Sequence, residues 1–292
     1  MEAEERKETE AADVPETKVH RPVAPFLGSK ETTGTIMKDV VIALAPAALF
    51  GVYRFGFRAF LILLLSVTSS VLAEHICKRI RKTPNGGYEC SAVVTGLLFG
   101  MMLSADVPYW IPVAGGVFSI VVIKMLFGGL GRNLLNPAAT GKCLFLILTG
   151  FLMKETSIGE VSVFLLLLGG LYLVACRVIS LWPPLLYLSV FGTVLAVFGA
   201  DGFVPEVWVR QFSNGSVVLG AFFLLNDVTT SPMTKAGRVL HAVLVGGLTG
   251  ALYVSGYRVE AVPFAILCGN LPVRLLDKLT FPRVSGKGKK AK

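Results

Sequence analysis

The chain has 292 residues, of which 53% are hydrophobic and only 16% are charged. This composition is typical of an integral membrane protein and excludes an ordinary soluble enzyme. The formal charge of +9 does not indicate nucleic-acid binding, because the basic residues gather at the ends of the chain and in one connection, where cytoplasmic segments of membrane proteins carry them.

The two ends of the chain are polar. Residues 1–35 are rich in Glu, Lys, Thr and Pro and lack the apolar centre of a signal peptide. We expect them to form a cytoplasmic arm that is partly disordered. Residues 281–292 are strongly basic, and we expect a cytoplasmic tail there.

Ten apolar runs lie between these ends, and each is a candidate membrane span. They cover residues 40–52, 60–73, 92–103, 110–127, 143–153, 161–175, 185–200, 217–225, 239–254 and 261–276. If both termini are cytoplasmic, 21 lysines and arginines lie inside and five outside, whereas Lys124 and Lys142 lie at or within span ends. The sequence therefore predicts an all-α, multi-pass protein of the cell membrane with about ten transmembrane helices.

The third and eighth runs begin with similar sequences. Residues 91–99 read Ser-Ala-Val-Val-Thr-Gly-Leu-Leu-Phe, and residues 215–223 read Gly-Ser-Val-Val-Leu-Gly-Ala-Phe-Phe. The run after each of them carries a glycine pair. We therefore expect two five-span repeats, residues 36–153 and 160–280, and because five is odd the second repeat must enter the membrane from the opposite side.

The third, fifth, eighth and tenth runs are short or interrupted, and they occupy equivalent positions in the two repeats. Broken helices at matching positions of an inverted repeat indicate a binding site at the interface between the repeats. The alternative is that these four helices are merely short, tilted neighbours.

Residues 126–141 are the most unusual stretch of the chain. Three glycines within residues 128–131 allow a tight turn and a close approach, and Pro137 suits the first turn of a following helix. Asn133 and Asn136 add buried amide groups beside a helix N-terminus, whose partial positive charge attracts electron-rich groups. The alternative interpretation is a close helix crossing with a connecting loop.

Asp227 closes the short eighth run and is followed by threonines. An ionisable residue at such a place indicates function, although it is also a common helix cap. Lys124 either holds an anionic group or extends its amine to the membrane surface, and Glu74 is expected at that surface. We take as candidate cofactor-binding residues Asn133, Asn136, Thr140, Asp227, Thr229 and Thr230.

Other kinds of site are not indicated. The sequence has no phosphate-binding loop, dinucleotide fingerprint, nucleophile elbow or zinc motif. Its five cysteines form no Cys-x-x-Cys pair and its three histidines are scattered, so we expect no metal site.

Several of these stretches resemble one known family: the D subunit of Rnf-type ion-translocating electron-transport complexes and the related B subunit of the sodium-pumping NADH:quinone oxidoreductase. The glycine-rich Asn-Pro block and the Asp-containing block together are specific, and the resemblance runs from about residue 23 to 280. The similar stretches are residues 36–40, 43–47, 91–98, 124–141, 220–223, 227 and 230–232.

The resemblance implies ten spans in inverted repeats, a bound flavin, and electron transfer coupled to Na⁺ or H⁺ movement. It also implies other membrane, flavin and iron–sulfur subunits as partners within the lipid bilayer. Members of the family attach FMN to a threonine in a Ser/Thr-Gly-Ala-Thr-like motif between spans five and six. Here residues 154–160 contain Thr156 but not that motif. We therefore expect a non-covalent flavin, FMN or riboflavin, or a subunit that has lost one carrier.

Two other functions agree with the same architecture. Inverted repeats with broken helices also suit a solute transporter, for example for a flavin vitamin. A scaffold without a cofactor that holds redox partners is the third hypothesis.

Overall fold

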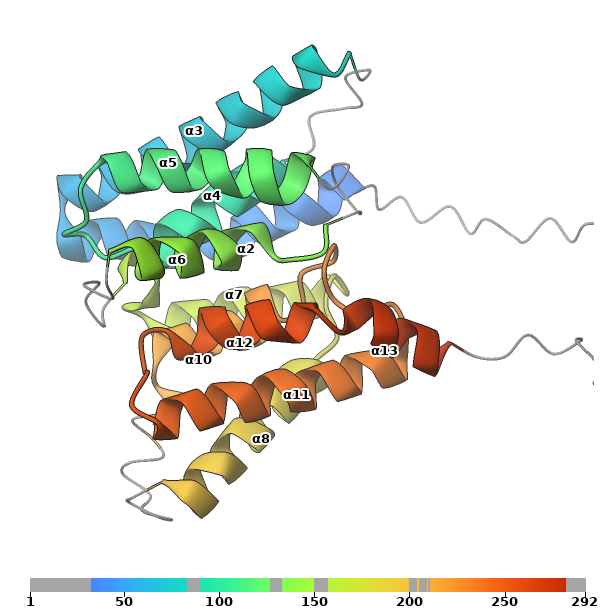
Figure 1. Ribbon diagram of the computed structural model, residues 1–292. Helices are drawn as coiled ribbons and strands as arrows, with labels where there is room; N and C mark the ends of the chain where they lie inside the picture. The colour runs from blue at the N-terminus through green and yellow to red at the C-terminus, as the bar shows by residue number, and fades with distance from the viewer. Residues whose placement is uncertain are drawn as a thin grey trace, which may run out of the picture. The chain divides into compact units, whose positions relative to one another are not determined.

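The computed structural model describes residues 33–82, 90–126, 133–149, 157–199, 204, 209 and 211–281. The expectations for most of the N-terminal arm and basic tail, for the glycines within residues 128–131 and for Thr156 lie outside these residues. All regular structure in the described residues is helical (Figure 1). The helices long and apolar enough to cross a membrane are α2 (Thr33–Phe55), α3 (Phe57–Ile80) and α11 (Lys235–Val254).

The described part of the chain also contains seven shorter apolar helices. Together with the three long ones they correspond to the ten apolar runs of the sequence. The shorter ones are α4 (Ser91–Met101), α5 (Trp110–Phe118) with its π-helical continuation η1 (Ser119–Met125), α6 (Pro137–Leu148), α7 (Val163–Ala175), α8 (Trp182–Phe198), α10 (Gly215–Leu219) with its π-helical continuation η3 (Gly220–Leu224), and α12 (Ala261–Asn270). A short 3₁₀ turn, η2 (Ile158–Glu160), precedes α7, and α13 (Val273–Thr280) follows α12. The all-helical membrane class is confirmed.

The helices of the four short runs, α4, α6, α10 with η3, and α12, have no more than 12 residues each. Their ends have local causes. Asn136 and Asn214 cap the starts of α6 and α10, and α12 ends just before Pro272. The capped start of α6 also explains why this helix begins at Pro137, six residues before the apolar run that predicted it.

Glycine pairs allow the same close packing in both halves of the chain. α5 lies along α3, and α11 lies along α8 (Figure 1). A Cβ atom on Gly116 would lie 2.3 Å from the Ser69 hydroxyl, and one on Gly246 would lie 2.7 Å from the Tyr187 carbonyl oxygen. Any larger side chain at either position would therefore push two helices apart.

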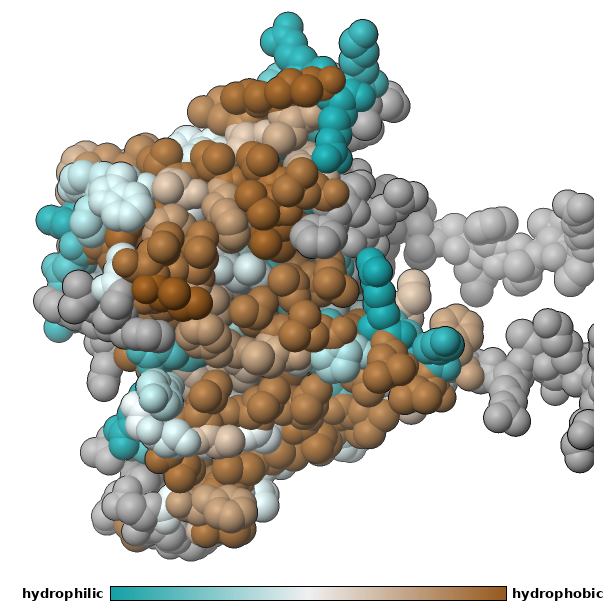
Figure 2. Space-filling view, viewed as in Figure 1, coloured by the Kyte–Doolittle hydropathy of each residue, from teal (hydrophilic) through white to brown (hydrophobic). Residues whose placement is uncertain are grey.

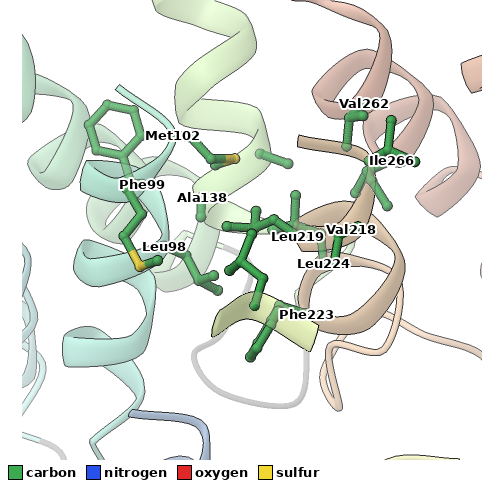
Figure 3. Close-up of a cluster of buried hydrophobic side chains, with 14 of the residues drawn as sticks. Leu98, Phe99, Met102, Ala138, Val218, Leu219, Phe223, Leu224, Val262 and Ile266 are labelled. Atoms are coloured by element: carbon green, nitrogen blue, oxygen red, sulfur yellow. The ribbon is translucent and has the colours of Figure 1, made fainter. Parts of the chain in front are cut away.

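The two halves meet through α2 against α7 and α6 against α12. A cluster of buried apolar side chains fills the junction and draws on α4 and α6 from one half and α10, η3 and α12 from the other (Figure 3). Continuous apolar packing across the junction stabilises the position of the polar groups at its edge.

Apolar side chains also cover much of the face of the molecule that Figure 2 shows. Leu49, Phe164 and Leu171 are exposed large hydrophobic residues on helices that also have buried faces. Apolar area of this extent is unfavourable in water, but it is the natural exterior of a helix bundle in lipid.

Candidate functional site

Asn136 lies at the N-terminus of α6 and connects the two halves of the chain. Its side-chain oxygen accepts a hydrogen bond from the Ala139 amide at 3.0 Å, and Pro137 occupies the first turn, as the sequence predicted. Its amide nitrogen donates to Asp227 Oδ2 at 3.2 Å. Both ends of the Asn136 side chain are thus engaged within the protein.

Asp227 lies in the turn between η3 and α11. Its carboxylate accepts hydrogen bonds from the Thr229 amide at 3.2 Å, from the Thr229 hydroxyl at 3.0–3.1 Å and from the Thr230 hydroxyl at 3.1 Å. The capping alternative is therefore partly right, because Asp227 closes its own turn, whereas Thr234 caps α11. The bond from Asn136 adds a contact that local capping does not need.

A cavity of about 30 Å³ lies between these residues. Asn133, Asn136, Asp227 and Thr229 line it, so the structure brings four of the six predicted residues around one space. Thr230 supports Asp227 from outside the lining. Thr140 is also outside the lining, because its hydroxyl donates to the Asn136 carbonyl one turn back in α6.

Asn133 carries a buried acceptor at this cavity. Its side-chain oxygen is buried and has no hydrogen-bond partner within the described part of the chain. A buried polar atom without a partner costs roughly 1–3 kcal/mol. A donor group of a ligand, or a water molecule, would satisfy it.

Lys124 lies on the same cavity, and of the two alternatives for this residue the structure supports the one in which its amine holds an anionic group, the Glu74 carboxylate. The residue is 1% exposed, and its amine lies 2.7 Å from Glu74 Oε2 and 2.7 Å from the Ser91 hydroxyl. Glu74 is buried against the protein as well. A charge buried in a low-dielectric medium needs a partner, and the packing of α3 beside η1 supplies one.

Sequence reasoning left Lys124, Ser91 and Thr95 out of the candidate site, although all three line the cavity. These residues line the cavity only because particular helices pack together, and the packing of helices cannot be read from a single sequence. One signal was present: Ser91 opens the repeated motif of the third run.

The electrostatics of the cavity are mixed. The N-termini of α4 and α6 and the amine of Lys124 bring positive charge, whereas Asp227 brings a carboxylate. Such a cavity suits a polar ligand that carries both donors and electron-rich acceptors.

The fold and this cavity define a polytopic membrane protein with a polar site at the junction of two helical halves. Comparison with known proteins is more specific. The chain belongs to the NQR2, RnfD, RnfE family, whose model matches residues 21–155 and 147–286.

Individual relatives align over most of their length. The chain is 31% identical to the D subunit of the Na(+)-translocating ferredoxin:NAD(+) oxidoreductase complex of Acetobacterium woodii, over 90% of this chain and 94% of the relative. It is 30% identical to the D subunit of the proton-translocating ferredoxin:NAD(+) oxidoreductase complex of Clostridium ljungdahlii, over 89% and 93%. Identity to the D subunit of the ion-translocating oxidoreductase complex of Stutzerimonas stutzeri is 28%, over 90% and 95%.

Proposed function

We propose that the chain is the D subunit of an Rnf-type, ion-translocating ferredoxin:NAD⁺ oxidoreductase complex. Family membership and alignment over about nine tenths of the chain with subunits of that name carry the proposal. Within the complex the subunit takes part in electron transfer across the membrane, coupled to movement of Na⁺ or H⁺.

The proposal is tested by deleting the gene and assaying ferredoxin:NAD⁺ oxidoreductase activity in membranes. Activity should disappear and return when this chain is supplied, and iron–sulfur and flavin subunits should co-purify with a tagged copy. Unchanged activity in the deletion strain, or vesicles in which this chain alone takes up a solute, would contradict it.

The topology we propose has ten spans, both termini in the cytoplasm, and two inverted repeats, residues 36–153 and 160–280. Equivalent packing in the two halves supports it, since α3 with α5 corresponds to α8 with α11. Reporter fusions at residue 80 and at the C-terminus should both report the cytoplasm. Opposite reports from the two fusions would mean that the span count is wrong.

The cofactor we propose is a non-covalent flavin, FMN or riboflavin, whose polar atoms enter the cavity. Asn133, Asp227 and Thr229 would contact it, Asn136 would hold the cavity wall, and Thr140 and Thr230 would support that wall. The orphan oxygen of Asn133 fits a donor of the flavin. A volume of about 30 Å³ admits one polar edge or hydroxyl, not the whole ring.

Bound there, the flavin would supply one-electron transfer, which no side chain can supply. The chain's own residues would bind and orient its polar edge. Asn133 is buried, and Asp227 and Thr229 are half-buried. In a low-dielectric surrounding each hydrogen bond is stronger than in water.

A further inference from the structure

We propose that α13 is an interfacial helix that lies on the cytoplasmic leaflet of the bilayer and binds the headgroups of anionic phospholipids. The inference takes the side of the membrane from the proposed topology. It does not depend on the proposed flavin site.

One face of α13 is fixed to the protein. The Asp277 carboxylate accepts a hydrogen bond from the Met233 amide at 2.8 Å, and the Thr280 hydroxyl contacts the hydroxyl of Thr234, the residue that caps α11. Val273 is buried. Residues 273, 277 and 280 lie on one side of a helix, so α13 is held beside the first turn of α11 by this side.

The opposite side of α13 carries a stripe of leucines beside a stripe of basic residues. Leu271, Leu275 and Leu279 are between 56% and 71% exposed, and their spacing of four residues places them on one face. Arg274 and Lys278 are exposed and follow two of these leucines by three residues, so the two stripes are neighbours. Where Figure 1 places α13, Figure 2 shows hydrophilic surface directly beside hydrophobic surface.

The sequence around α13 is strongly basic. Residues 271–292 contain seven lysines and arginines and one acidic residue, Asp277, whose carboxylate accepts the hydrogen bond at the start of α11. Lys235, in the first turn of α11, is exposed at the same end of that helix. A cluster of roughly four to eight basic residues on an amphipathic helix or next to a membrane span is typical of binding to anionic lipid.

The combination of the two stripes favours a bilayer surface as the occupant. At the boundary between acyl chains and headgroups, the acyl chains cover the leucines and the anionic headgroups neutralise the basic side chains. The long stems of Arg274 and Lys278 allow their charged ends to reach the headgroups while the leucines stay in the apolar layer. An acidic protein surface would match only the charges and would leave the leucines beside polar groups.

The experiment measures the binding of spin-labelled phosphatidylglycerol to the purified full-length chain in mixed micelles of detergent and neutral phosphatidylcholine. Lys278→Gln should weaken this binding roughly fivefold, the effect expected for one basic residue near an anionic lipid surface. Arg54→Gln is the matched control, because Arg54 is also exposed but lies in the last turn of α2, outside the basic segment. It should leave the binding unchanged.

A second pair of variants separates the charges from the apolar stripe. Arg274→Gln combined with Lys278→Gln should weaken binding more than either change alone and reduce its dependence on salt. Leu279→Ser should also weaken binding, but the remaining binding should keep its dependence on salt, because the charges are still present.

Weaker phosphatidylglycerol binding in the α13 variants, with unchanged binding in Arg54→Gln, supports the proposal. Equal losses in Lys278→Gln and Arg54→Gln, or no loss in either, would overturn it while leaving the proposed topology intact. If Leu279→Ser keeps its lipid binding and loses another subunit from the purified complex, the surface binds a protein and the proposal is wrong. A C-terminal reporter on the outer side of the membrane would overturn both the cytoplasmic placement of α13 and the proposed topology.

Discussion

Two lysines are buried in the apolar part of this protein, and their surroundings differ. Lys124 is 1% exposed and Lys142 is 2% exposed. Lys124 makes a direct ion pair with Glu74, whereas Lys142 donates to the main-chain carbonyl of Met102. The carboxylates of Glu160 and Glu260 act on Lys142 electrostatically, but the structure gives no ion pair between them in the described residues.

Lys124 and Glu160, a carboxylate that acts on Lys142, line cavities of different size. Lys124 lines the cavity of about 30 Å³, whereas Glu160 lines a larger one of about 250 Å³ together with Gln211, Asn214 and Arg258. Lys142 anchors α6 to the end of α4. A buried lysine alone therefore does not identify a binding site, and the partner of its amine is the more informative feature.

The largest effect that we expect is a difference in stability loss between the removal of Glu74 and the removal of Glu160. Glu74→Ala removes the carboxylate that lies 2.7 Å from the buried amine of Lys124 and should destabilise the protein by roughly 3–5 kcal/mol. Glu160→Ala should cost much less, because the Lys142 amine keeps the Met102 carbonyl. Thermal unfolding of the purified protein in detergent measures both. Equal stability losses would remove the distinction between the two lysines.

Glu74→Ala combined with Lys124→Met should be more stable than Glu74→Ala alone, because the buried amine that lost the Glu74 carboxylate is then absent as well. A double variant that is as unstable as the sum of both single changes would mean that the pair is not coupled.

The next largest effect that we expect is a loss of flavin binding in Asn136→Leu, for which Asn214→Leu is the matched control. Each caps a short helix and donates a second hydrogen bond, to Asp227 and to the Tyr253 hydroxyl respectively. Asn136→Leu should weaken flavin binding by about 1–3 kcal/mol, roughly ten- to hundredfold in affinity. Asn214→Leu should lose similar cap stability, about 1 kcal/mol, and keep its flavin.

Flavin content and Tm of both purified variants give the comparison. If Asn136→Leu assembles and retains full flavin, or if both variants lose flavin equally, the assignment of the cavity is wrong.

The smallest effect that we expect is a pH dependence of stability from Glu160, at the larger cavity. Burial raises the pKa of Glu160 above its ordinary value of 4.5, and Lys142 and hydrogen bonds from Ser157 and Ser216 oppose this. A raised carboxyl pKa in the folded state means that stability is lost as pH rises through the window above the ordinary value. Glu160→Gln should therefore gain Tm relative to the unaltered protein as the pH rises from about 5 to about 8. A Tm difference that does not vary with pH would contradict the burial of this carboxylate.

The sequence was sufficient to predict the features that depend on residues close together in the chain. Apolar runs located the helices, and Asn136 followed by Pro137 located a helix start. The proximity of Asn136 and Asp227 was also predicted, because breaks at matching positions of the two expected repeats should converge at their interface. These inferences needed only local pattern and internal symmetry.

The contact between Glu74 and Lys124 could not be predicted in the same way. Both residues lie at ends of apolar runs, where a charged side chain normally reaches water. Their burial follows from the packing of α3 beside η1 and from a π-helical turn at Lys124, neither of which has a clear sequence signature. The number of spans, the repeat symmetry and the cofactor role of the six site residues remain predictions.

The central claim, a non-covalent flavin at the Asn136–Asp227 cavity, is tested most directly by one flavin analysis. The purified protein is denatured, and flavin is measured separately in the supernatant and on the polypeptide. The account predicts that the flavin is found in the supernatant and that the polypeptide shows no flavin fluorescence in a gel. It also predicts that Asn136→Leu releases less flavin than the unaltered protein. No flavin in either fraction would contradict it, and so would a fluorescent polypeptide that loses its fluorescence in Thr156→Ala.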